Sequence, residues 1–174
     1  GSILPPPAEP PTPVEPSTPP EPQSLEGITP NTPDYWRKTV YNWGLQQWGT
    51  PEAADIFTSQ LSLESMGFNL DVVWGRTRGG QGEIGIAQFM PGTAAGLGID
   101  PWNPNSAIPA SAAFMTTQLN KYSGDWRKAL AAYNAGGARV NEAIELGGEN
   151  WFARLPDVKV GGFTPEAGRS VQGY

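Results

Sequence analysis

Apolar side chains recur three and four positions apart along most of the chain after residue 33, which is the spacing of amphipathic helices. A first helix is expected from Asp34, a residue type favoured at the N-cap. A second is expected from Thr50-Pro51, a cap residue followed by proline at the first helical position, to about Ser65.

The rest of the chain continues the same pattern. Four further helices are predicted, over residues 91–97 up to Gly98, about 107–122, 126–134 after the cap Asp125, and about 138–146 after Gly136-Gly137. Residues 69–74 could form a short strand, and the Gly-rich residues 147–174 are expected to be irregular. The pattern predicts an all-α domain without internal repeats.

Residues 3–33 are dominated by proline, with Glu, Ser and Thr between the prolines. Such a segment has too little apolar surface to offset the entropy of ordering, so we expect an extended, solvated arm. The initial Gly-Ser is interpreted as a cloning remnant, and the chain as part of a larger polypeptide. The predicted division is therefore an arm over 1–33 and a domain over 34–174.

Composition narrows the chemistry. The chain of 174 residues has a formal charge of −6, but four of its seventeen acids lie in or beside the arm, which leaves thirteen acids against eleven bases. No basic stripe suggests nucleic acid, and no apolar run is long enough to span a bilayer. Without His or Cys, the usual zinc sites, Ser-His triads and thiol nucleophiles are excluded, so a carboxylate is the leading candidate for an acid/base.

A glycine motif over residues 80–85 (Gly-Gln-Gly-Glu-Ile-Gly) matches the dinucleotide fingerprint. That motif should open a long helix, which Pro91 would interrupt. A flexible loop or a wall of an active-site cleft is the better interpretation.

One carboxylate, Glu64, lies on an otherwise apolar face of the second predicted helix. Glu64 shares a helix face with Ala53, Phe57 and Leu61, and burying an ionised carboxylate is costly unless it has a partner or a raised pKa. A carboxyl kept protonated near neutral pH can act as a general acid. The alternative is a solvated or ion-paired Glu64 at a frayed helix end.

Three segments resemble the motifs of the lytic transglycosylases related to goose-type lysozyme. Residues 64–69 (Glu-Ser-Met-Gly-Phe-Asn) are similar to that family's Glu-Ser-Gly-Phe-Asn, residues 85–94 (Gly-Ile-Ala-Gln-Phe-Met-Pro-Gly-Thr-Ala) to its second motif, and residues 131–136 (Ala-Ala-Tyr-Asn-Ala-Gly) to its third. Each segment alone is a weak signal, but three in the family's order are specific.

The resemblance implies a lysozyme-like helical fold with a groove for peptidoglycan glycan strands. It makes Glu64 the catalytic acid/base, places Gln88 on the cleft floor, and brings Tyr133 and Asn134 to the reacting region. Ser65 joins the candidate substrate-binding residues, although support of the helix end is its more natural role. Tyr133 as a core aromatic and Asn134 as a helix C-cap are the alternatives.

The chain departs from the family pattern in several places. Met66 is an extra residue, Trp74 falls where the family often has Ser, and Ala87 replaces a common Met. Glu166 and Tyr174 could be remnants of a late family element. The seven tryptophans could stack on sugars, but most are expected in the core.

The resemblance implies cleavage of the bond between N-acetylmuramic acid and N-acetylglucosamine without water, giving a 1,6-anhydromuramic product and needing no metal or cofactor. The alternatives are a hydrolase using Asp71, Glu83 or Asp100 as second carboxylate, with Glu83 the best placed, and an inactive glycan-binding module. We expect a monomer acting in the periplasm or cell envelope, outside the cell, or in a phage virion.

Overall fold

The computed structural model describes residues 3–11 and 20–158 of the chain. Glu166 and Tyr174 lie outside the described residues, as do the initial Gly-Ser and the end of the predicted domain. Within the described part the fold is all-α, as the sequence predicts, and its β structure is a single isolated bridge between Ile84 and Phe89. No helix there is both long and apolar enough to cross a membrane.

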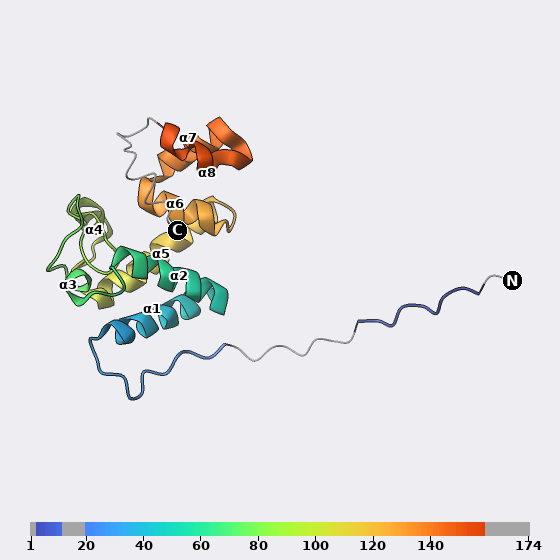
Figure 1. Cartoon of the computed structure of the whole chain (residues 1–174), viewed down its shortest axis with the longest axis horizontal. Helices are drawn as coiled ribbons and strands as arrows, with labels where there is room; N and C mark the ends of the chain where they lie inside the picture. Colours follow the sequence, from blue (N-terminus) through green and yellow to red (C-terminus); the bar gives the residue numbers. More distant parts are fainter. Residues whose placement is uncertain (1–2, 12–19, 159–174) are drawn as a thin grey trace.

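Eight α-helices and two short 3₁₀ helices make up the described chain (Figure 1). They are α1 (Pro33–Trp48), α2 (Pro51–Glu64), α3 (Leu70–Val73), α4 (Pro91–Leu97), α5 (Pro104–Lys121), α6 (Trp126–Ala135), α7 (Gly137–Gly147), α8 (Trp151–Arg154), and the 3₁₀ helices Gly148–Asn150 and Leu155–Asp157.

The capping chemistry explains most helix ends. The Thr50 side chain accepts a hydrogen bond from the Ala53 amide at the start of α2, and Asp125 accepts from the Lys128 amide at the start of α6, as predicted. The N-cap of α1 is Thr32, so the prediction of Asp34 as its cap was wrong.

Two other local predictions need correction. Residues 70–73 form helix α3 in place of the suggested strand, because the Asn69 side chain accepts from the amides of Asp71 and Val72 and so starts a helical turn. Residues 148–157 are helical where an irregular segment was expected, and Trp151, 4% exposed, anchors them.

The first layer of the molecule is the pair α1 and α2, which pack along each other. Gly44 permits this, since a Cβ at that position would lie 3.0 Å from the Cα of Ala54. Their apolar faces join the hairpin after α3 and the first turns of α5 in the main core, which includes the fully buried Phe57, Leu61 and Phe68.

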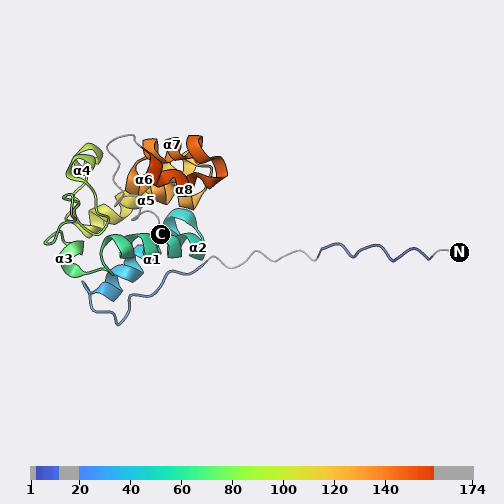
Figure 2. The same ribbon diagram turned by 45° about the horizontal axis from the view of Figure 1, so that its top comes forward.

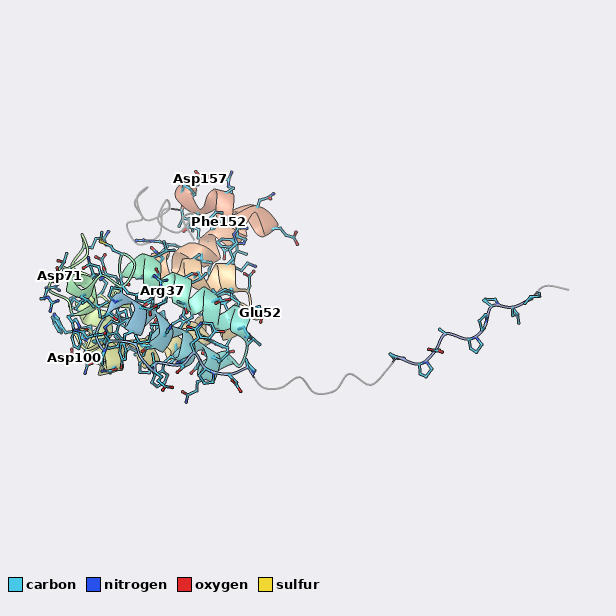
Figure 3. All side chains as sticks on the ribbon, turned by 60° about the horizontal axis from the view of Figure 1, so that its bottom comes forward. Arg37, Glu52, Asp71, Asp100, Phe152 and Asp157 are labelled. Atoms are coloured by element: carbon cyan, nitrogen blue, oxygen red, sulfur yellow. The ribbon has the colours of Figure 1, made fainter. Side chains whose placement is uncertain are left out.

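The second layer is formed by α6, α7 and α8, with a separate core around Val140, Trp151 and Leu155. Helix α5 runs between the two layers, as Figures 1 and 2 show from two directions. A small cluster of Met115, Leu119 and Ala129 joins α5 to α6. Charged side chains such as Glu52, Asp71 and Asp157 are exposed on the outside (Figure 3).

The end of the Pro-rich segment lies on the folded domain. Gln23 makes two hydrogen bonds with the Asn42 side chain through its backbone N–H (2.7 Å) and C=O (2.9 Å). The Asn31 Oδ1 atom accepts from the indole N–H groups of Trp36 (3.0 Å) and Trp74 (2.7 Å). Residues 3–11, in contrast, are exposed throughout, so these contacts favour an arm that ends before Gln23.

Candidate active site

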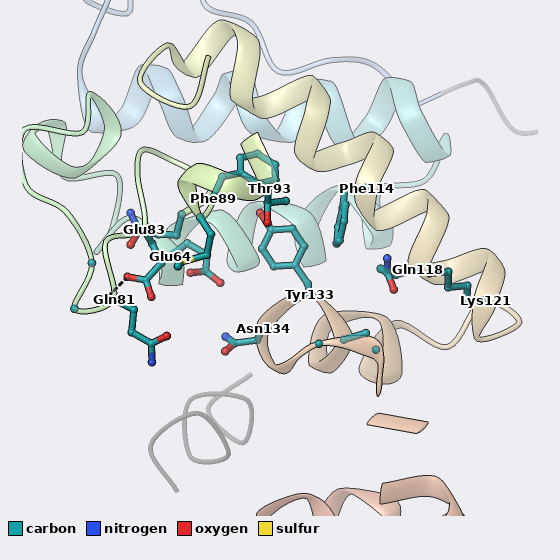
Figure 4. Close-up of a pocket in the computed structure, with 17 residues that line it drawn as sticks. Glu64, Gln81, Glu83, Phe89, Thr93, Phe114, Gln118, Lys121, Tyr133 and Asn134 are labelled. Carbon is teal, nitrogen blue, oxygen red and sulfur yellow. Dashed lines mark hydrogen bonds between the residues drawn. The ribbon is translucent and has the colours of Figure 1, made fainter. Parts of the chain in front are cut away.

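A cleft of about 630 Å³ opens between the two layers (Figure 4). The end of α2 and the hairpin after α3 form one side, and α5 with the α6–α7 junction forms the other. The lining residues come from all three family-like segments and are Glu64, Gly79, Gly80, Gln81, Glu83, Gln88, Phe89, Met90, Thr93, Phe114, Gln118, Lys121, Ala132, Tyr133, Asn134, Gly136 and Gly137.

Glu64 is the last residue of α2 and is partly buried in the cleft wall. Three residues before it, Leu61 is fully buried in the main core, so packing fixes the helix end that carries the carboxylate. The buried face of α2 therefore places the Glu64 carboxylate at the cleft.

Ser65 is fully buried and does not line the cleft. Its hydroxyl donates to the Leu61 carbonyl (2.6 Å) and accepts from the Phe68 amide (3.0 Å). Ser65 thus holds the end of α2 and the following turn together, and the structure corrects its inclusion among substrate-binding residues.

The extra residue of the first motif is accommodated on the surface. Met66 is 75% exposed, and with Gly67 and Phe68 it forms a run of three residues with positive φ (55°, 74° and 60°). This left-handed turn lets Phe68 return to the core, where it is fully buried. The insertion therefore leaves both Glu64 and the core residue after it in place.

Gln88 lines the cleft at the tip of the hairpin closed by the Ile84–Phe89 bridge. Its φ is 51°, a conformation that costs a non-glycine residue about 1–2 kcal/mol. The side-chain Nε2 donates to the Gly85 carbonyl (2.9 Å), which leaves Oε1 as the acceptor of this amide. Strain at a cleft residue is a common mark of a functional position.

Tyr133 ties the second and third motifs together. Its hydroxyl donates to the Ala87 carbonyl (2.7 Å) and accepts from the Ser111 hydroxyl (3.4 Å), and its ring packs edge-on against Phe114. Burial, with a smaller contribution from the negative charge of Glu64, raises the pKa of Tyr133 well above its usual value of 10.0. Tyr133 is thus close enough to Glu64 for its pKa to respond to the charge of that carboxylate. Its hydroxyl proton, however, is used in the hydrogen bond to the Ala87 carbonyl.

Asn134 follows Tyr133 on α6 and lines the same cleft, where Figure 4 shows its amide directed toward the side that carries Gln81. The helix ends one residue later at Ala135, so Asn134 is not its C-cap, a position taken by Gly136. The structure brings Glu64, Gln88, Tyr133 and Asn134 to one cleft.

The Gly-rich loop over residues 79–83 forms a wall of the cleft and opens no long helix, which excludes the dinucleotide interpretation. The loop is braced: the Gly79 amide donates to the Glu83 carbonyl (2.9 Å), and Arg78 donates to the Gly82 carbonyl (2.8 Å). One Glu83 carboxylate oxygen accepts from the Gln81 amide (3.1 Å).

The other candidate second carboxylates lie outside the cleft lining. Asp71 pairs with Arg76 (2.8 Å) on the surface, and Asp100 accepts from the Trp102 amide (3.0 Å) in a turn. Only Glu83 among the three candidates shares the cleft with Glu64.

The sequence interpretation missed the α5 wall of the cleft. Phe114, Gln118 and Lys121 line it, and their spacing of four and three residues places them on one helix face. That spacing was visible in the sequence, but no role was predicted for these three residues. None of the seven tryptophans lines the cleft.

The fold and the cleft define an all-α, lysozyme-like domain with one carboxylate at a helix end. Among known protein families, the one described as "Transglycosylase SLT domain" matches residues 63–153, more than half of the chain. The chain belongs to this family.

Two curated relatives come from bacteriophages. A protein named "Transglycosylase" from Enterobacteria phage PRD1 is 39% identical over 67 residues, which cover 38% of this chain and 25% of that protein. "Peptidoglycan transglycosylase gp16" from Escherichia phage T7 is 34% identical over 85 residues, 44% of this chain and 6% of that protein. The chain thus matches a quarter or less of each relative's length. No solved structure matches significantly.

Proposed function

We propose that this protein is a peptidoglycan lytic transglycosylase that cleaves between N-acetylmuramic acid and N-acetylglucosamine and forms 1,6-anhydromuramic acid. The observation that carries the proposal is Glu64, fixed by a buried helix face at the wall of an open cleft that the other two family motifs also line. Family membership and the names of the two phage relatives support it.

In the proposed reaction, the Glu64 carboxyl donates its proton to the glycosidic oxygen as the bond from C1 of the muramic acid breaks. The acetamido group of the same sugar stabilises the positive charge that develops on C1. Ionised Glu64 then takes the proton from the C6 hydroxyl, whose oxygen bonds to C1. Glu64 ends protonated again, and no water is consumed.

The remaining cleft residues hold the reactants. Gln88 lines the cleft and keeps its amide oxygen as an acceptor, and Asn134 lines the cleft from α6. Tyr133 acts as a positioning residue, because its hydroxyl fixes the backbone next to Gln88. We assign these roles because Gln88, Tyr133 and Asn134 lie in the second and third segments that resemble the family's motifs.

A hydrolase is the second candidate, and the braced position of Glu83 favours it. A hydrolase needs a second carboxylate to activate water or to form a covalent intermediate. Glu83 lies in the same cleft as Glu64 on a loop that internal hydrogen bonds hold in place. The two candidates differ in their product, which decides between them.

Replacing the catalytic carboxyl tests the proposal. Glu64→Gln should reduce the release of fragments from purified cell walls by about 10²–10⁴-fold, because the amide is nearly isosteric but cannot donate the proton. Binding to walls and the thermal midpoint should stay near wild type. Glu52→Gln, an exposed glutamate in the first turn of the same helix, is the matched control and should leave activity unchanged. Full activity of Glu64→Gln would refute the proposal.

A further inference from the structure

The proposed chemistry does not use the end of the cleft away from Glu64. Figure 4 shows Gln118 and Lys121 there, on the cleft side of α5. From Ser111, which contacts Tyr133, to Lys121 the helix rises about 15 Å at about 1.5 Å per residue, so this end lies well beyond the reacting centre.

Gln118 is an unusual residue for a helix face that packs on a core. It is only 5% exposed, yet its side-chain amide makes no hydrogen bond to any described residue. Its amide atoms are not among the fully buried polar atoms without a partner in the described part of the chain, so they reach the cleft, where water or a ligand can bind them. Because Gln118 lines the cleft, its missing partners belong on the cleft side.

Two positive groups adjoin Gln118. Lys121 is the one cation among the described residues of the cleft lining, and it forms no ion pair with them. Helix α7 starts at Gly137, which also lines the cleft, and its N-cap residue Gly136 has no side chain that could accept from the first amides. A helix N-terminus carries positive partial charge and backbone N–H donors.

The relative position of these groups is fixed by Tyr122, the residue after Lys121. Its hydroxyl lies 2.9 Å from Asn141 Oδ1 and 3.4 Å from the Gly137 carbonyl oxygen, so it ties the start of α7 to the end of α5. The ammonium group, the amide and the helix N-terminus therefore border the same end of the cleft.

We propose that this end of the cleft is a subsite for a carboxylate of the substrate. The ammonium group and the helix N-terminus supply only donors and positive charge, and the Gln118 amide adds N–H donors beside its acceptor oxygen, a combination that suits a carboxylate. Resting on the proposed function, the carboxylate comes from the stem peptide or from the lactyl group of a muramic acid. Either source would guide the strand so that the reacting bond reaches Glu64.

The test measures binding of soluble glycan fragments to the Glu64→Gln protein, which does not cleave them. Three probes are compared: fragments bearing stem peptides, the same fragments after an amidase has removed the peptides, and peptide-bearing fragments with carboxyls converted to carboxamides. Adding Lys121→Gln should weaken binding of the peptide-bearing fragments about fivefold to tenfold at low salt, and less at about 0.5 M salt because the interaction is screened. The carboxamide fragments should bind the parent as weakly as the charged fragments bind Lys121→Gln.

Lys38→Gln removes a charge from α1, outside the cleft, and is the control that should leave affinity unchanged. Gln118→Leu should also weaken binding, while Lys121→Gln at an exposed position keeps the test valid if the leucine variant folds poorly. A loss confined to peptide-bearing fragments supports the subsite with the stem peptide as source, and a loss that persists without peptides supports it with the lactyl carboxylate.

Equal affinity of the parent and Lys121→Gln for every charged fragment would overturn the subsite and leave the proposed function intact. A parent that binds none of the fragments would overturn both. The two failures are therefore distinguishable.

Discussion

Tyr133 has a hydroxyl with two partners, the Ala87 carbonyl and the Ser111 hydroxyl. A tyrosine that delivered its proton to a substrate would need that proton free. Its contacts instead join α6, α5 and the hairpin that carries Gln88, and Gln88 itself is held at a strained φ of 51°. At the scale of single residues, the Tyr133 hydroxyl and the strained Gln88 hold the backbone of the cleft that Glu64 lines.

Tyr133→Phe should therefore lower stability, and the size of the effect should depend on pH. Losing the hydrogen bond to the buried Ala87 carbonyl is expected to cost about 1–2 kcal/mol at neutral pH. Because the native state raises the pKa of Tyr133, this advantage of the wild type is complete below about pH 10, the pKa of an unfolded tyrosine. Above about pH 10 the unfolded state loses the proton first, so the advantage shrinks by up to about 1.4 kcal/mol per pH unit.

Urea unfolding of both proteins at several pH values between about 8 and 11.5 measures this difference. An advantage that stays constant or grows with pH would show that the native state does not favour the protonated tyrosine.

The end of α2 shows what a helix contributes to the site. The helix supplies a buried face that ends in Glu64, and the left-handed turn of Met66, Gly67 and Phe68 redirects the chain at once. The sequence predicted this helix and its cap, because Thr50-Pro51 is a local signal. The left-handed turn was not predictable, since only tertiary packing of Phe68 makes two non-glycine residues adopt it.

Elsewhere, too, local signals were predictable from the sequence, whereas features set by tertiary packing were not. Asp125 and Gly98 mark helix ends locally and were predicted correctly. Helix α3 was mistaken for a strand because its apolar residues are too few to show a period, and the Asn69 cap decides it. Glu64, Gln88, Tyr133 and Asn134 were found through motifs, whereas Lys121 and Gln118 lie in no motif and needed the three-dimensional cleft.

Met66→Gly should stabilise the protein by about 0.5–1 kcal/mol, or a few degrees in thermal midpoint. Met66 is 75% exposed, so little packing is lost, while glycine adopts a φ of 55° without the steric cost. Gly67→Ala is the opposite control: its φ is 74° and an added Cβ would meet nothing within 4 Å, so backbone strain alone should destabilise it. Equal midpoints for both variants and the wild type would contradict a left-handed turn.

The whole molecule places α5 between two helical layers, and the cleft opens between those layers (Figures 2 and 4). The first layer also carries the end of the N-terminal segment. Asn31 serves as shared acceptor for two indole N–H groups, one of them from Trp36, which is only 3% exposed. That segment therefore takes part in the packing behind the cleft.

Two truncations should separate arm from domain. Removing residues 1–21 should leave the thermal midpoint unchanged, because the described contacts with the domain begin at Gln23. Removing residues 1–31 should lower it by about 5 °C or more, since a buried indole N–H without its acceptor costs about 1–3 kcal/mol. Asn31→Ala in the full chain should reproduce much of that loss. Identical midpoints for both truncations would show that the segment contributes nothing to stability.

The most direct test of the central claim is mass analysis of the fragments released from purified peptidoglycan. If Glu64 works alone, the tethered C6 hydroxyl is the favoured nucleophile because of its high effective concentration. The fragments should then end in 1,6-anhydromuramic acid, one water lighter than a reducing end and resistant to borohydride, and Glu83→Gln should change the yield little. Fragments with mostly reducing ends, together with a loss in Glu83→Gln as large as that in Glu64→Gln, would contradict the account and make the protein a lysozyme.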